Sequence, residues 1–70
     1  MIKRVTKKHI LEGAKICHEY GYWSQETNNF LNEFEYYANQ KINTILASVY
    51  NSNTAYASYH YQLFKDNNLI

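Results

Sequence analysis

The apolar residues of this chain recur mainly at steps of three and four, which is the spacing of one buried helix face. The longest stripe runs through the middle of the sequence and consists of Leu31, Phe34, Ala38, Ile42, Ile45 and Val49. A shorter stripe near the amino end consists of Ile10, Ala14 and Cys17, flanked by Leu11 and Tyr20. This pattern predicts an all-α fold, a small bundle of three to four helices.

Capping residues give the expected bounds of these helices. Thr6 and Ser24 are good amino-terminal caps, and Gly21 is a typical helix stop. Asn43 is a third candidate cap, so we expect the long stripe to divide between Asn39 and Asn43. The expected helices are Thr6 to Tyr20, Ser24 to Asn39, Asn43 to Tyr50 and Thr54 to Lys65. One continuous helix over residues 24–50 is the alternative.

Residues 44–63 also fit a β-hairpin. Every second residue from Ala55 to Leu63 is Ala, Tyr or Leu, and Tyr is common in strands. The helical interpretation is favoured because the upstream stripe continues through Ile45 and Val49 without a Gly or Pro to stop it.

Length and composition indicate one small domain, residues 1–70, with many aromatic side chains. Apolar residues are 46% of the sequence, which is enough for folding, but a chain of this size buries only about 60% of its surface. The twelve rings, from eight Tyr, three Phe and one Trp, exceed what such a core can enclose. We therefore expect some rings to meet a partner or a second copy of the chain, as in a homo-oligomer.

The basic residues are concentrated at the amino end. The formal net charge is only +1, yet four of the seven Lys and Arg residues are Lys3, Arg4, Lys7 and Lys8. Residues 1–9 are thus a basic amino-terminal arm. No apolar run has the length of a membrane span or follows the arm as a signal sequence would, so we expect a cytoplasmic protein. The abundance of Lys, Asn, Ile and Tyr is typical of AT-rich genomes, including those of phages and mobile elements.

No pattern in the chain supports catalysis, a metal site or a cofactor. Cys17 and His18 are adjacent on a helix and point about 100° apart, so neither a shared metal ion, even with His9, nor a nucleophile pair is expected. A single cysteine also excludes an internal disulfide. We therefore expect a binding protein, not an enzyme.

Under the helical interpretation, the end of the chain has the spacing of a helix-turn-helix. Ala47 is the small residue of the first helix, Tyr50 closes that helix, and Asn51 takes the turn position, where a positive φ is usual and Asn is tolerated. The inner face of the second helix consists of Ala57, Tyr61 and Phe64.

This segment resembles the helix-turn-helix of winged-helix repressors of the GntR and MarR types. The residues that carry the resemblance are Leu46-Ala47, Asn51, Asn53-Thr54 and Asn68-Leu69-Ile70. Ser52 and His60 are polar where these families usually have aliphatic residues. The sequence stops where the β-wing would begin, so we expect no complete winged helix.

The resemblance implies a small DNA-binding protein, a transcriptional regulator that acts as a homodimer on double-stranded DNA. With the composition, it points to a regulator of a phage or mobile element. The major groove would be contacted by Asn53, Thr54, Ser58 and Gln62, and phosphates or thymine methyls by Tyr56 and Tyr59. Phosphate neutralisation would come from the basic arm through Lys3, Arg4, Lys7 and Lys8, with Lys15.

A protein partner is the alternative, because the net charge is near zero and Tyr is abundant. The chain would then be a small phage-type protein that binds and inhibits a host protein, such as a defence or transcription component. The residues expected at that contact are Trp23, Tyr56 and Tyr59.

Overall fold

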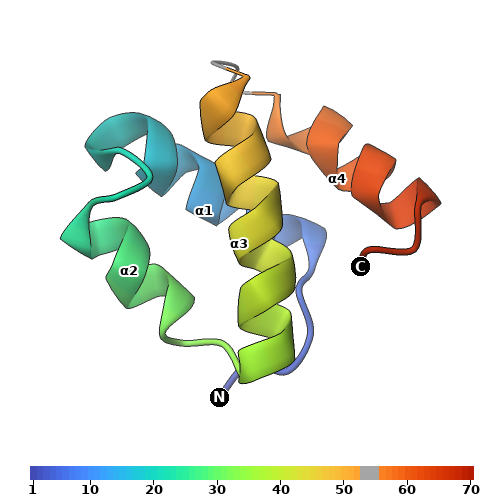
Figure 1. Cartoon of the computed structure of the whole chain (residues 1–70), viewed down its shortest axis with the longest axis horizontal. Helices are drawn as coiled ribbons and strands as arrows, with labels where there is room; N and C mark the ends of the chain where they lie inside the picture. Colours follow the sequence, from blue (N-terminus) through green and yellow to red (C-terminus); the bar gives the residue numbers. More distant parts are fainter. Residues whose placement is uncertain (53–55) are drawn as a thin grey trace.

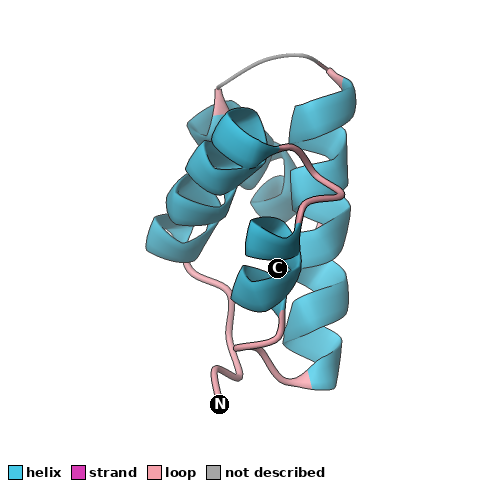
Figure 2. Ribbon diagram, turned by 90° about the vertical axis from the view of Figure 1, so that its left-hand side faces the viewer, coloured by secondary structure: helices cyan, strands magenta, loops and turns pink. Residues whose placement is uncertain are grey.

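The computed structural model describes residues 1–52 and 56–70, which form four helices. They are α1 (Lys7–Tyr20), α2 (Gln25–Leu31), α3 (Tyr36–Asn51) and α4 (Ala57–Asp66). In Figure 1, α3 stands at the centre with α2 on one side and α4 on the other, and α1 packs against all three. In Figure 2 the described residues are drawn as helices and loops. The all-α prediction is confirmed, and the hairpin interpretation is wrong, since residues 44–51 and 57–63 are helical.

Both ends of α1 follow from its capping residues. The hydroxyl of Thr6 accepts from the backbone N–H of His9 at 3.4 Å, and Nδ1 of His9 accepts from the backbone N–H of Thr6 at 3.1 Å. This reciprocal pair satisfies two N–H groups that have no partner inside the helix. Gly21 ends α1 with a φ of 96°, and its N–H donates to the carbonyl of Cys17 at 2.9 Å. The predicted cap and stop are confirmed.

The division of the long stripe lies earlier than predicted. Helix α2 ends at Leu31 and α3 begins at Tyr36, so the expected break between Asn39 and Asn43 is wrong, as is the single helix over 24–50. Asn39 and Asn43 both lie inside α3. The side-chain amide of Asn39 donates to the carbonyl of Leu31 at the end of α2. The side chain of Asn43 caps nothing and accepts from the hydroxyl of Tyr22.

A contact with the amino-terminal arm explains the position of the break. The backbone N–H of Ile2 donates to the carbonyl of Glu33 at 3.0 Å, and its carbonyl accepts from the N–H of Glu35 at 2.8 Å. These bonds form a single parallel bridge between Ile2 and Phe34. The carbonyl of Glu33 and the N–H of Glu35 thus bond to the arm and not within a helix. The chain can therefore turn between α2 and α3 and bury Phe34.

The core consists of two clusters joined through α1 and α3. One contains Cys17, Phe30, Leu31, Phe34, Ala38, Ile42 and Leu46. The other contains Ile10, Ala14, Ile45, Val49, Ala57 and Phe64. All six residues of the long stripe are buried despite the interruption, so the predicted apolar face is confirmed. None of the described helices has both the length and the apolar character that crossing a membrane requires.

The carboxyl-terminal helix pair differs from the predicted one at the turn. Asn51 is the last helical residue of α3, and the non-glycine residue with a positive φ in the described parts of the chain is Asn68, so the predicted turn role of Asn51 is wrong. The expected start of the last helix at Thr54 lies outside the described residues. The predicted inner face is confirmed, with Ala57 and Phe64 buried and Tyr61 half-buried.

Candidate nucleic-acid interface

The basic arm is anchored to the fold along its length. Besides the bridge of Ile2 to Phe34, the side chains of Ile2 and Val5 pack partly buried against the core. The intervening Lys3 and Arg4 are exposed. The positions of their backbone are therefore fixed, while their charged ends face solvent.

The anchored arm brings Lys3 and Arg4 to a surface of α3. They line a hollow of about 160 Å³ whose other lining residues are Val5, Tyr37, Ala38, Lys41 and Ile70. Tyr37 and Lys41 are four residues apart, so both project from one face of α3. Sequence reasoning missed these two residues. The spacing of Tyr37 and Lys41 in the sequence shows that they share a polar face of α3. It does not show that the arm lies beside this face, because that depends on the bridge between Ile2 and Phe34.

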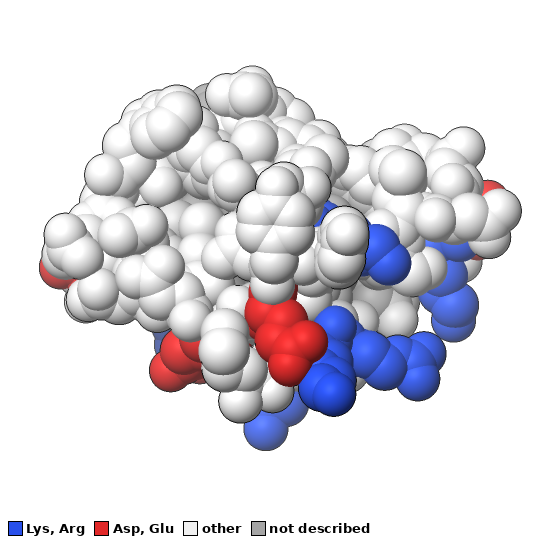
Figure 3. Space-filling model, turned by 60° about the horizontal axis from the view of Figure 1, so that its bottom comes forward, with Lys and Arg blue, Asp and Glu red and all other residues white. Residues whose placement is uncertain are grey.

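Lys7 and Lys8 extend this group of positive charges. Both are exposed in the first turn of α1, which contains no acidic residue. We call Lys3, Arg4, Lys7, Lys8 and Lys41 the cationic surface. In Figure 3, Lys and Arg side chains gather on one half of the bottom of the molecule, bordered by acidic groups. None of the five forms a salt bridge with a carboxylate of the described residues.

The predicted base-contacting residues lie along the exposed side of α4. Ser58, Tyr59 and Gln62 are exposed, as is Tyr56 just before the helix. The amide of Gln62 donates to a carboxylate oxygen of Asp66 at 2.8 Å. Asn53 and Thr54 lie outside the described residues. The structure thus gathers Tyr56, Ser58 and Tyr59 at the start of α4.

The cationic surface meets α4 near its other end. A second hollow, of about 220 Å³, is lined by Gln40, Lys41, Thr44, Phe64 and Leu69. Lys41 therefore belongs to both hollows, and the cations adjoin the carboxyl-terminal half of α4. The aromatic residues Tyr56 and Tyr59 lie at the start of α4, so the arm does not adjoin them.

The two polar departures from the repressor pattern contact each other. His60 is buried, and its Nδ1 and Nε2 lie 3.4 and 3.3 Å from the hydroxyls of Ser48 and Ser52. The hydroxyl of Ser52 also donates to the carbonyl of Val49 at 3.0 Å. Ser52 and His60 are thus hydrogen-bonded to each other between α3 and α4. An aliphatic pair at these positions would make only apolar contacts.

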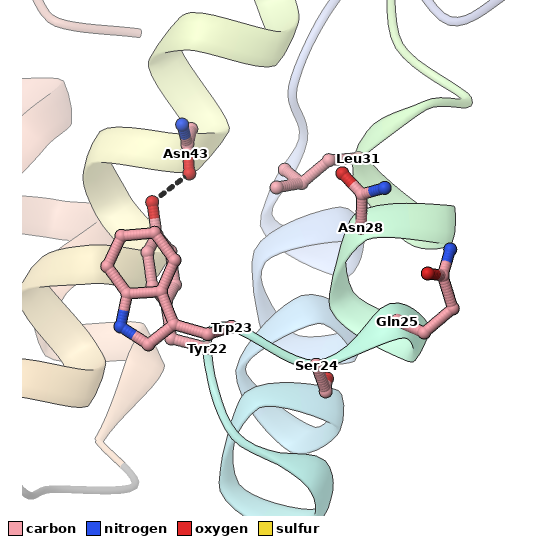
Figure 4. Close-up of a pocket in the computed structure, with 7 residues that line it drawn as sticks. All are labelled: Tyr22, Trp23, Ser24, Gln25, Asn28, Leu31 and Asn43. Atoms are coloured by element: carbon pink, nitrogen blue, oxygen red, sulfur yellow. Dashed lines mark hydrogen bonds between the residues drawn. The ribbon is translucent and has the colours of Figure 1, made fainter.

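An aromatic end lies away from the cationic surface and comprises Tyr22, Trp23, Tyr50, Tyr56 and Tyr59. Trp23 is 86% exposed, and its ring packs edge-to-face with that of Tyr22, with centroids 4.7 Å apart. Figure 4 shows the Tyr22 hydroxyl reaching Asn43 of α3, with the Trp23 ring beside Tyr22. The ring of Tyr50 lies 6.2 Å from that of Tyr22.

The hydroxyls of Ser24 and Thr27 hold the turn that carries Trp23. The hydroxyls of Ser24 and Thr27 donate to the carbonyl of Gly21 at 2.7 and 2.9 Å, and Ser24 accepts from the N–H of Thr27 at 3.1 Å. Thr27 is completely buried. The predicted cap at Ser24 is confirmed.

Burial raises the pKa of two groups, one beneath the aromatic end and one within it. It raises the pKa of the Cys17 thiol, against a smaller lowering by the hydrogen bond with Thr27. It also raises the pKa of Tyr22, helped by the nearby Cys17 and opposed by the hydrogen bond to Asn43. A buried thiol of raised pKa is a poor nucleophile. No three His, Cys, Asp or Glu side chains of the described residues are arranged to hold a metal ion.

Comparison of the chain with protein-family models, curated proteins and solved structures gives no significant match.

Proposed function

We propose that this protein is a non-catalytic DNA-binding protein that holds duplex phosphates with its cationic surface and turns the exposed side of α4 toward the major groove. The observation that carries the proposal is the anchoring of the arm, which aligns Lys3 and Arg4 with Lys41. A role as a transcriptional regulator of a phage or mobile element, acting as a homodimer, extends the same proposal.

The placement of Lys7 and Lys8 supports a binding role. The amino end of a helix carries a partial positive charge, so lysines in its first turn are electrostatically unfavourable for the fold. The same helix end and its lysines attract anions. These side chains are therefore better suited to bind phosphates than to stabilise the protein.

The exposed side of α4 supplies groups that can contact bases. Ser58 and Gln62 offer a hydroxyl and an amide, and the exposed ring of Tyr59 can contact a phosphate or a thymine methyl. With Asn53 and Thr54, these are the residues that the repressor resemblance implies. The Gln62 amide already donates a hydrogen bond to Asp66, so a base that accepts from this amide must replace that bond.

Duplex binding at several salt concentrations tests the two contributions separately. Replacing Lys3, Arg4, Lys7 and Lys8 with Ala should flatten the slope of log affinity against log salt by about 3 to 4 per chain, on every sequence alike. Ser58→Ala or Gln62→Ala should cost about 1 to 3 kcal/mol only on a preferred site selected from random duplexes. Absence of salt-dependent duplex binding by the parent protein would overturn the proposal.

The exposure of Trp23 favours a second candidate, inhibition of a host protein through the aromatic end. Large exposed aromatic side chains are frequent binding hot spots, and Trp23, Tyr56 and Tyr59 are 86%, 76% and 66% exposed. Under this candidate the duplex experiment fails, and Ala substitutions of these three residues abolish capture of the partner in a pull-down. Under the DNA proposal, Trp23→Ala leaves duplex affinity unchanged.

A further inference from the structure

We propose that the hollow between the arm and α3 binds single-stranded nucleic acid, with an unpaired base stacked on Tyr37 and the neighbouring phosphates held by Lys3, Arg4 and Lys41. The inference rests on the proposed function in one respect, which is that the arm cations bind phosphates. Its ligand is an unpaired strand, and its central residue, Tyr37, has no part in duplex binding.

The charge of the hollow matches a nucleic-acid backbone. Three of its seven lining residues are cations, and none has an acidic side chain. The cations come from two segments that both line the hollow, Lys3 and Arg4 from the arm and Lys41 from α3. Backbone phosphates supply negative charges at a regular spacing, so successive phosphates can be held by cations of the two segments.

The Tyr37 ring provides the stacking surface. It is 79% exposed, although it lines the hollow, and it packs edge-to-face against Tyr36 with centroids 5.5 Å apart and an interplanar angle of 75°. An edge-to-face neighbour steadies the ring and leaves a ring face open. Lys41 lies one helical turn further along the same face of α3. An open ring beside cations is the combination that binds unpaired bases and their phosphates together.

Two features favour an unpaired strand over a duplex or a free phosphate. The bases of a duplex already stack on one another, so they offer no free face to Tyr37. A free phosphate would use the cations and leave the ring without a role. An unpaired strand uses both.

The strand also has a path beyond Tyr37. Lys41 is shared with the second hollow, where Gln40 and Thr44 add polar groups and Leu69, 46% exposed, adds an apolar one. The exposed face of α3 from Tyr37 to Thr44 spans about 10 Å, at 1.5 Å per residue. The two hollows thus form one track along α3 toward the end of α4.

The test compares binding of labelled oligo(dT), oligo(rU) and a duplex of equal length by the full chain at low salt. Tyr37→Ala should weaken oligo(dT) binding roughly 5- to 100-fold and leave duplex binding unchanged. Tyr37→Phe keeps the ring and should bind like the parent. Tyr20→Ala is the matched control, because Tyr20 is also exposed but lies at the opposite end of α1 from the arm.

Charge variants give effects of both signs. Lys41→Ala should reduce the salt slope of oligo(dT) binding by about 0.7, the value for one phosphate of a single strand. Glu33→Gln should strengthen binding, because Glu33 is exposed and its backbone pairs with the arm beside Lys3. An unchanged affinity in the Glu33 variant would contradict the position assigned to the strand.

A spectroscopic variant reports stacking directly. In a Trp23→Phe background, Tyr37→Trp places the indole fluorophore at this site, and stacking on a base should quench its emission as oligo(dT) is added. Quenching supports the inference. Binding without any change in emission overturns it.

The outcomes separate this inference from the proposed function. Loss of oligo(dT) binding in Tyr37→Ala supports the inference whether or not the parent binds duplex, and tighter binding of oligo(rU) than oligo(dT) would identify RNA as the preferred strand. Equal oligo(dT) affinities of Tyr37→Ala and the parent overturn the inference, even if the duplex results uphold the proposed function.

Discussion

The cationic surface and the aromatic end are held by the fold in different ways. The cations are positioned through their backbone, by the bridge at Ile2 and by the first turn of α1, and their charged ends have no salt-bridge partner among the described carboxylates. The aromatic end rests on side-chain hydrogen bonds, including Tyr22 to Asn43 and His60 to Ser48 and Ser52.

This difference separates binding from stability. Removing a charge from the cationic surface breaks no internal bond, so it should alter ligand affinity and leave the fold intact. Removing a polar group beneath the aromatic end leaves a buried partner unsatisfied, which destabilises the fold before it affects any surface contact.

The largest effect is expected from reversing charge at the start of α1. Lys7→Glu with Lys8→Glu should weaken duplex binding at least about thirtyfold at physiological salt, since each lost phosphate contact accounts for roughly a factor of five. The same change should raise the free energy of unfolding by about 0.3–1 kcal/mol per position, because acidic side chains suit a helix amino end.

The control is the neutral pair Lys7→Gln with Lys8→Gln, which should weaken binding less and shift stability less. Gel-shift titration and thermal unfolding give the two readouts. A fall in stability together with affinity would show that the lysines support the fold, and the contrast between the two surfaces would be lost.

An intermediate effect is expected at the buried histidine beneath the aromatic end. His60→Leu should lower the free energy of unfolding by about 1–3 kcal/mol, because it leaves the hydroxyls of Ser48 and Ser52 without their ring partner. Ser52→Val with His60→Leu replaces both bonded polar groups with apolar ones, so it should recover part of the loss.

Urea unfolding of the two single variants and the double variant measures the coupling. A coupling energy of roughly 0.5–1.5 kcal/mol is expected for a directly bonded pair. Strictly additive effects would mean that the His60 to Ser52 bond contributes nothing. Duplex affinity should be unaffected by Ser52→Val, which changes no cation.

The helical stripes, the caps at Thr6 and Ser24 and the stop at Gly21 could be predicted because they depend on neighbours within a few residues. The break after Leu31 could not, because it depends on Ile2, which is distant in sequence from Glu33 and Glu35. Asn43 has the chemistry of a cap, but inside α3 its side-chain oxygen Oδ1 accepts from the hydroxyl of Tyr22 instead.

The candidate site was predictable only in part for the same reason. Clustering of Lys3, Arg4, Lys7 and Lys8 at one end is visible in the sequence. Lys41 and Tyr37 join them only because the arm folds back against the start of α3. The helix-turn-helix spacing involves only residues 46–70, so it carries no information about the contact between the arm and α3.

The smallest effect is expected from alkaline pH at the aromatic end. Burial raises the pKa of Cys17 and of Tyr22 above their ordinary values of 9.0 and 10.0. A raised pKa in the folded state means that the unfolded chain loses these protons first. Their contribution is therefore complete below pH 9 and is lost as pH rises through the folded-state values.

Thermal unfolding midpoints between neutral pH and about pH 11 should show this loss. Cys17→Ala with Tyr22→Phe removes both groups and should flatten the alkaline part of the curve, whereas Tyr20→Phe, at an exposed position of α1, should follow the parent. At neutral pH the same double variant should bind nucleic acid like the parent, because neither Cys17 nor Tyr22 belongs to the cationic surface. If the double variant lost affinity at neutral pH while the chain stayed folded, the two regions would be coupled, and the separation of binding from stability would not hold.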